Sequence, residues 1–162
     1  MALPIFHVPG PCIVYFGTGV APTDSVGETK AGVIITPETH LVPIVTDEYG
    51  DVPIDYIFTG KSALVECVSM VLADLLTCAY FRALLGKDEA VGTLYNAGST
   101  TQYSLKITER VVTDIWQADC CFPLLPTEIR MRTSQELQMP LRFQILPDDN
   151  GALFTTVPAY LV

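Results

Sequence analysis

Four carboxylates lie close together in "DEYGDVPID", residues 47–55, with no base among them. They are Asp47, Glu48, Asp51 and Asp55. Carboxylate oxygens are ligands that Ca²⁺ takes in proteins. Read as an EF-hand loop from Asp47, the stretch places Pro53 at the seventh position and Phe58 at the twelfth, where a bidentate glutamate is needed. This excludes an EF-hand and leaves two readings, an irregular weak cation site or an acidic arm that grips another subunit.

Nucleophiles and bases are few, and none forms a local motif. The chain has two histidines, His7 and His40, and five cysteines without a Cys-x-x-Cys spacing. The adjacent Cys120 and Cys121 point to opposite faces if they lie on a strand, so they do not have the usual spacing for binding one ion. We expect buried cysteines in a reducing compartment, no catalytic residue, no metal and no cofactor. A small Cys or His enzyme stays an alternative, because residues distant in sequence can converge.

Composition fits a single domain, residues 1–162, that does not grip nucleic acid. The net charge is −9, whereas binding to phosphates depends on lysine and arginine. Charged residues make up 17% of the chain, below the average of about 25%. Either the core is large or another chain covers part of the surface. The most apolar stretch, 63–85, is interrupted by Glu66, Asp74 and Arg82, which argues against a membrane helix.

The elements that would position these residues are mostly short strands. Apolar and β-branched runs predict strands at 12–17, 31–45, 62–72, 103–110, 113–125, 137–146 and 152–157. Helical spacing with Gly86 as the C-cap predicts one helix over 73–86. We expect a loop over 17–28, a turn at 147–151, an extended N-terminal arm over 1–11 and an inter-strand arm over 44–61. The whole predicts a mainly antiparallel β-sandwich or barrel of about seven strands with one flanking helix.

Three segments together resemble the tail tube proteins of bacteriophages. They are "GVIITPETHLVPIVTDEYGDVPIDYIFTGKSALVECVS" (32–69), "ADLLTCAYFRALLG" (73–86) and "MPLRFQILPDDNGALFTT" (139–156). The resemblance implies a tail-tube-like fold, related to the type VI secretion tube protein, in which one helix follows a long strand. It implies a structural virion protein, assembled in the host cytoplasm, that forms stacked homohexameric rings. A neck, tail-terminator or baseplate ring protein of related fold is the alternative.

The resemblance also implies partners. The chain would assemble with itself, with a tape-measure protein and, in a contractile tail, with a sheath protein, while DNA passes through the channel without specific binding and no part of the chain anchors in a membrane. The arm would join one ring to the next. Its residues are Asp47, Glu48, Tyr49, Asp51, Asp55, Tyr56 and Phe58. Arg130 and Arg132 are candidate basic partners, and Glu66 either faces the channel or pairs with a base at an interface.

Overall fold

The computed structural model describes residues 5–19, 21–48, 50–69, 103–110, 115–124 and 139–159. It contains the strands β1 (Phe6–Val8), β2 (Cys12–Thr18), β3 (Ser25–Ile44), β4 (Asp55–Ser69), β5 (Tyr103–Glu109), β6 (Ile115–Leu124) and β7 (Met139–Ile145). All of their pairings are antiparallel, which confirms the predicted class. The predicted helix 73–86 lies outside the described residues, and the described part has no α-helix. It accordingly holds no helix long and apolar enough to cross a membrane.

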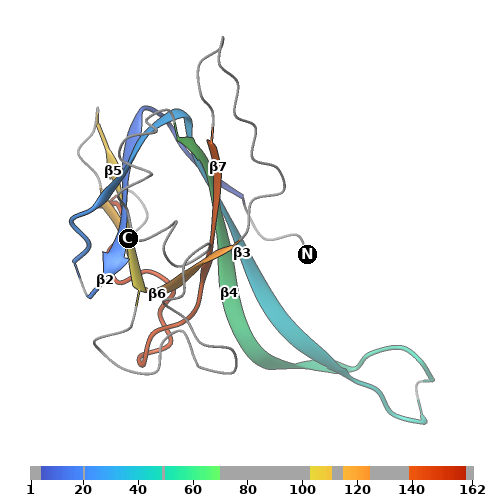
Figure 1. Ribbon diagram of the computed structural model, residues 1–162. Coiled ribbons are helices and arrows are strands. Elements are labelled where there is room, and N and C mark those ends of the chain that lie inside the picture. Colours follow the sequence, from blue (N-terminus) through green and yellow to red (C-terminus); the bar gives the residue numbers. More distant parts are fainter. Residues whose placement is uncertain are drawn as a thin grey trace.

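The sheet closes on itself. Its order is β1-β3-β2-β5-β6-β7-β4, and β4 also pairs with β3. Six strands, β2 to β7, therefore form a complete ring, and β1 lies beside β3 beyond the end of β2 (Figure 1). Closure within one chain leaves few unpaired strand edges on the barrel wall.

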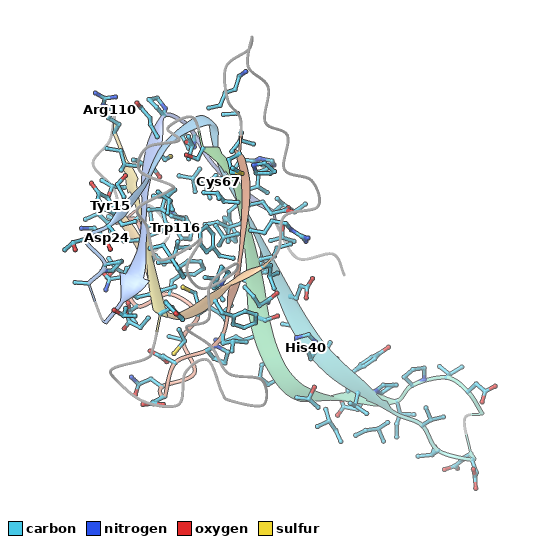
Figure 2. All side chains as sticks on the ribbon, in the orientation of Figure 1. Tyr15, Asp24, His40, Cys67, Arg110 and Trp116 are labelled. Carbon is cyan, nitrogen blue, oxygen red and sulfur yellow. The ribbon has the colours of Figure 1, made fainter. Side chains whose placement is uncertain are left out.

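Aromatic and aliphatic side chains fill the interior of the barrel. On β5 and β7 every second residue is buried, as the pleat of a strand with one inward face requires. Phe16 stacks on Tyr103 with ring centroids 5.2 Å apart and lies at the same distance from Phe143 in a tilted arrangement. Figure 2 shows Trp116 farther along the same interior, where its ring contacts Phe154 edge to face. The alternation predicted for 103–110 is confirmed.

The two longest strands continue far beyond the barrel. β3 and β4 pair from Thr29 and Ser69, inside the wall, to Ile44 and Asp55, and a loop joins them. Figure 1 shows this hairpin extending away from the other strands. We call residues 38–60 the arm, residues 38–44 and 55–60 its ribbon, and residues 45–54 its tip.

Several strand bounds differ from the predictions. Residues 25–28, expected in a loop, begin β3, where a positive φ at Gly27 accompanies an irregularity in the pairing with β2. Residues 6–8, expected in a free arm, form β1, because Pro9 and Pro11 fall outside the paired segment. β4 begins at Asp55 rather than at residue 62, since the ladder to β3 continues through the acidic stretch.

The predicted return strand 152–157 is wrong. The turn at 147–151 does form, closed by a bond from the Gly151 amide to the Asp148 carbonyl. The segment after it makes only an isolated bridge between Thr156 and Gln117 of β6. The segment is anchored instead by Phe154, which packs against Trp116. A short apolar run after a turn therefore packed as a loop rather than as a strand.

Gly10 and Gly32 cross at close range where β3 changes partners. A Cβ added at Gly32 would lie 2.1 Å from the Val8 carbonyl oxygen, and one added at Gly10 would lie 2.5 Å from the Gly32 amide nitrogen. The φ of Gly32 is +84°, in the left-handed region that favours glycine. The β3–β4 register also shifts between Thr29 and Val33. Because the two backbones approach so closely here, β1 and β2 can pair with consecutive stretches of β3.

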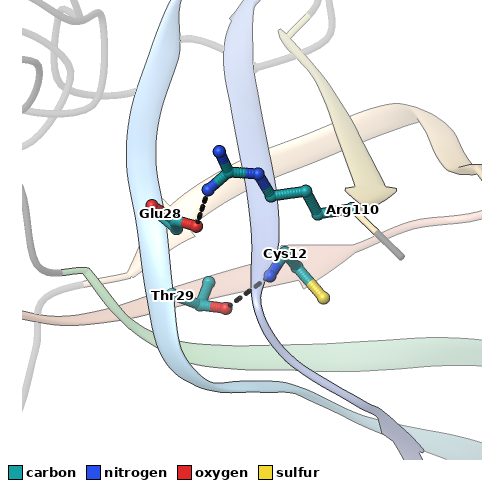
Figure 3. Close-up of polar contacts among 4 residues, drawn as sticks. All are labelled: Cys12, Glu28, Thr29 and Arg110. Carbon is teal, nitrogen blue, oxygen red and sulfur yellow. Dashed lines mark hydrogen bonds and ion pairs between the residues drawn. The ribbon is translucent and has the colours of Figure 1, made fainter. Parts of the chain in front are cut away.

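Side chains tie together three strands at this end of the barrel (Figure 3). The Thr29 hydroxyl of β3 accepts a hydrogen bond from the Cys12 amide of β2 at 3.1 Å. Arg110, just after β5, reaches across β2 to pair with Glu28 of β3. These contacts link β3 and β5 through the strand between them and thereby support the wall from which the arm extends.

Candidate functional site

The arm gathers the exposed apolar surface of the molecule. Ten large hydrophobic side chains are exposed in the described part, and eight of them lie on the arm. They are Leu41, Val42, Val45, Val52, Ile54, Tyr56, Ile57 and Phe58. A contiguous apolar surface of this kind marks an interaction site far more often than an isolated exposed leucine does. The arm is therefore the candidate functional site.

The ribbon has two faces, and both carry apolar side chains. Residues paired across an antiparallel ladder share a face, and successive residues alternate. One face thus carries Leu41 opposite Phe58 and Pro43 opposite Tyr56, and we call it the aromatic face. The other, the aliphatic face, carries Val42 opposite Ile57 and Ile44 opposite Asp55. Phe58 is 58% exposed and Ile57 is 53% exposed, so neither face is covered.

Both edges of the ribbon are open within the described residues. β1 pairs with β3 only at 33–35, and β7 pairs with β4 only at 63–69. Pro37 and Pro43 lie on the stretch of β3 whose only partner in that part of the chain is β4. Proline has no amide hydrogen to donate, so it is tolerated at such an edge. Both prolines therefore lie where the missing amide hydrogen leaves no ladder bond unmade in the described residues.

A β-bulge fixes the base of the arm. His40 pairs with Gly60 and Leu41 with Phe58, so Thr59 is an extra residue on β4. Its hydroxyl donates a hydrogen bond to the His40 carbonyl at 2.9 Å, and Gly60 takes a φ of +152°. A bulge bends the ladder and increases its twist. The bulge marks where the ribbon leaves the barrel wall, close to residue 61, where the predicted inter-strand arm ends.

The acids at the tip are spread along the loop within the described residues. Asp47, Glu48 and Asp51 are exposed, and no three His, Cys, Asp or Glu side chains gather closely enough to hold a metal ion in the ranges the structure describes. The Asp55 carboxylate accepts a hydrogen bond from the Tyr56 amide at 2.8 Å. Tyr49 lies outside those ranges. The acids instead give the end of the arm a concentrated negative charge.

One serine–histidine pair stands at the base of the arm. His40 Nε2 lies 3.3 Å from the Ser62 hydroxyl, a distance at which histidine can act as a base toward serine. Among the described residues the other His40 ring nitrogen has no carboxylate partner to orient it, and the side chain is exposed. His7 lies apart on β1, opposite Ile34. The pair lacks the third group that a serine–histidine–acid triad uses.

The buried thiols are poorly suited to nucleophilic catalysis. Burial raises the pKa of the Cys67 thiol to about 12, with a smaller contribution from Cys12. Burial also raises the pKa of Cys12, with Glu109 adding to the effect, and the pKa of Cys121, with Cys120 adding to it. The thiolate is the reactive form, so these three side chains stay protonated and inert near neutral pH. Cys78 lies outside the described residues.

Glu66 lies on the outward side of β4, between the inward-facing Val65 and Cys67. Its Oε1 atom is 3.1 Å from Nε of Arg142 on the neighbouring β7, although the two groups are not aligned as a hydrogen bond. Both side chains are partly exposed, so the pair contributes about 0–1 kcal/mol. The pair lies within one chain, and the predicted position of Glu66 in the channel stays a prediction.

The sequence identified the acids of the arm but missed most of its apolar residues. Tyr56 and Phe58 were expected at the interface. Leu41 and Val42 were predicted only as part of a strand, and Ile57 lay in the predicted arm without a role at the interface. The signal was two apolar runs, "LVPIV" and "DYIF", at similar distances on either side of an acidic loop. Arg130 and Arg132 lie outside the described residues, so their pairing with the tip stays a prediction. Comparison of the chain with protein-family models and with curated proteins finds no match.

Proposed function

We propose that the chain is a structural virion protein of a bacteriophage tail that assembles with itself into stacked hexameric rings, the tube through which DNA enters the host. The observation that carries the proposal is the arm, a long paired ribbon with exposed apolar side chains on both faces. A large exposed apolar surface on an ordered element indicates a protein partner. The three segments that resemble tail tube proteins identify the partner as another copy.

The remaining features agree with a structural role. The described residues hold one partly buried serine–histidine pair without an orienting carboxylate, and three inert thiols. The net charge of −9 suits a channel for DNA, because a basic lining would bind phosphates and slow their passage. A tape-measure protein and, in a contractile tail, a sheath protein would then be further partners.

A second candidate, a neck or tail-terminator ring, is favoured by the closure of the sheet. A shared wall of strands from several subunits needs open edges, and six strands here already form a complete ring within one chain. Open edges in the described part include those of β1 and of the ribbon. A ring protein that uses its arm to cap a tube would need no other edge.

The experiment compares the wild-type chain with a variant in which Asn-Gly replaces residues 41–58. This two-residue turn joins His40 to Thr59 and removes the tip and most of the ribbon, while the strands of the barrel are kept. Size-exclusion chromatography and negative-stain electron microscopy follow assembly. We expect tubes from the wild type and unstacked rings from the variant.

Three other outcomes are informative. A wild-type chain that stays monomeric at high concentration contradicts the proposal. Wild-type rings that never stack favour the neck or terminator role. Long tubes from the variant without its arm would show that the arm does not join the rings.

A further inference from the structure

We propose that assembly buries the ribbon on both of its faces, between surfaces that belong to neighbouring copies of this chain. The ribbon would not lie with one face on a single subunit and the other in water. This inference rests on the proposed function and deepens it. It concerns the geometry of the contact rather than the existence of the contact.

The composition of the two faces is the first reason. A sheet with one face in water alternates apolar and polar residues, whereas a strand covered on both faces reads as a continuous apolar run. The residues at 41–44 are Leu, Val, Pro and Ile, and those at 56–58 are Tyr, Ile and Phe. Neither run contains a polar break. Residues 41–44 and 56–58 of the ribbon therefore have the sequence of strands covered on both faces.

The position of the ribbon is the second reason. Within the described part of the chain, residues 41–43 and 55–59 are exposed, because the arm extends away from the barrel (Figure 2). A channel filled with water and DNA suits neither face, since both are apolar. Packing one face on a neighbour would leave the other as exposed as it is now. Covering both faces removes the whole apolar surface from water.

The area available fits two small contacts that act together. The eight exposed side chains of the arm are each about half accessible. Side chains of these types offer roughly 100–200 Å² each, so the arm presents about 400–800 Å² of apolar surface. A standard interface takes about 800 Å² from each partner. Either face of the ribbon alone falls well short of that area, whereas the two faces together with the apolar residues of the tip approach it.

The occupant that the proposed function gives is a second copy of the chain, and the distribution of charge is compatible with it. Residues 31–60 hold five acids and no lysine or arginine, so the remaining 13 of the 18 acids and all nine bases of the chain lie outside this stretch. The bases make the body of another copy less repulsive to the arm than a second arm would be. An acidic tip is repelled by nucleic acid and by anionic lipid. The combination of apolar ribbon and acidic tip matches a protein surface that carries bases.

The test removes apolar surface from one face at a time. Leu41→Thr with Phe58→Thr alters the aromatic face, and Val42→Thr with Ile57→Thr alters the aliphatic face. Threonine keeps the preference for a strand. The matched control is Ile34→Thr, an exposed isoleucine on the same strand within the barrel wall. Circular dichroism verifies folding, and sedimentation velocity gives the concentration at which half of the chain is assembled.

We expect each double variant to raise that concentration at least tenfold and Ile34→Thr to change it less than threefold. Loss of assembly in one double variant alone overturns the two-faced contact while the proposed function stands. Unchanged assembly in both overturns it as well. A wild-type chain that never assembles overturns both proposals, so the two failures can be told apart.

A second measurement does not depend on weakening the contact. Residues 57 and 58 point to opposite faces, so Ile57→Cys and Phe58→Cys each place a thiol on one of them. The rate of modification by a maleimide is compared before and after assembly, with the wild-type chain as background. We expect both thiols to be protected at least tenfold in the assembled form. Protection at one position only contradicts the inference.

Discussion

Replacing Gly32 by alanine tests the crossing of Gly10 and Gly32 that allows β1 and β2 to share one strand. The φ of +84° costs an alanine about 1–2 kcal/mol. The new Cβ would lie 2.1 Å from the Val8 carbonyl oxygen, and this backbone atom cannot rotate away. β1 must then move, which exposes the buried Val8 side chain at a further cost of about 1.5–3 kcal/mol.

The expected loss is thus about 3–5 kcal/mol in the free energy of unfolding. For a chain of this length, each kcal/mol lowers the midpoint of thermal unfolding by about 2–4 °C. We therefore expect a decrease of about 6–20 °C by differential scanning calorimetry. Urea denaturation followed by tryptophan fluorescence provides a second measurement, because Trp116 contacts Phe6 of β1 with ring centroids 5.9 Å apart.

Alanine substitutions at three other glycines separate the cost of the positive φ from the cost of the steric contact. Gly151→Ala introduces the φ cost alone, since its φ is +78° and nothing lies within 4 Å of the new Cβ. Gly10→Ala introduces the steric contact alone, 2.5 Å from the Gly32 amide nitrogen at a φ outside the left-handed region. Gly17→Ala introduces neither, because its nearest neighbour is the Pro22 Cβ at 3.7 Å. The close crossing is refuted if Gly32→Ala destabilises the protein no more than Gly151→Ala does.

Three further predictions concern the core, the thiols and the tip. Phe143→Ala should lower the free energy of unfolding in urea by about 3–5 kcal/mol. Phe58→Ala in the monomer should change it by less than about 0.5 kcal/mol. Equal losses would mean that the chain itself covers the arm. Because the pKa of Cys67 is about 12 against 9.0 for a free thiol, the unfolded chain loses this proton first, so stability should fall as pH rises from about 9 to about 12. A fall of the same steepness in Cys67→Ala would contradict that assignment. Asp51→Lys with Asp55→Lys should weaken stacking more at low salt than at high salt, with Asp24→Lys as the control, and an effect independent of salt would exclude pairing with bases.

The strands that were predicted best are those with one buried face. On β5 the apolar residues Tyr103, Leu105 and Ile107 alternate with Ser104, Lys106 and Thr108, and the apolar set lies in the core. The period-two signal is then unambiguous. The apolar residues at 152–157 predicted a strand from a much shorter stretch. In the structure Phe154 packs against Trp116, although the segment does not pair as a strand.

The arm shows why an exposed apolar surface could not be predicted from one sequence. Its ribbon is apolar on both faces, which in a lone sequence is the signature of a strand deep inside a sheet. Whether the cover comes from the same chain or from another depends on tertiary contacts, and these are invisible to periodicity. The acids of the tip were found because charge can be counted residue by residue. Leu41 and Ile57 were not recognised, because their exposure is a property of the fold.

The distribution of charge along the arm also bears on how free chains avoid the wrong contact. An apolar ribbon with open edges is an aggregation hazard, and charged residues beside such a segment reduce it. Glu38 and Asp55 flank the runs of the ribbon, and three more acids lie on the tip. Two arms brought together would place ten acids and no lysine or arginine side by side, twice the five in residues 31–60. In the proposed assembly an arm on the body of another copy would face a surface that also holds the nine bases of the chain, so charge disfavours the symmetric arm-to-arm dimer more strongly. The proposed contact is then head to tail, and such a contact can continue from subunit to subunit as a stacked tube would require.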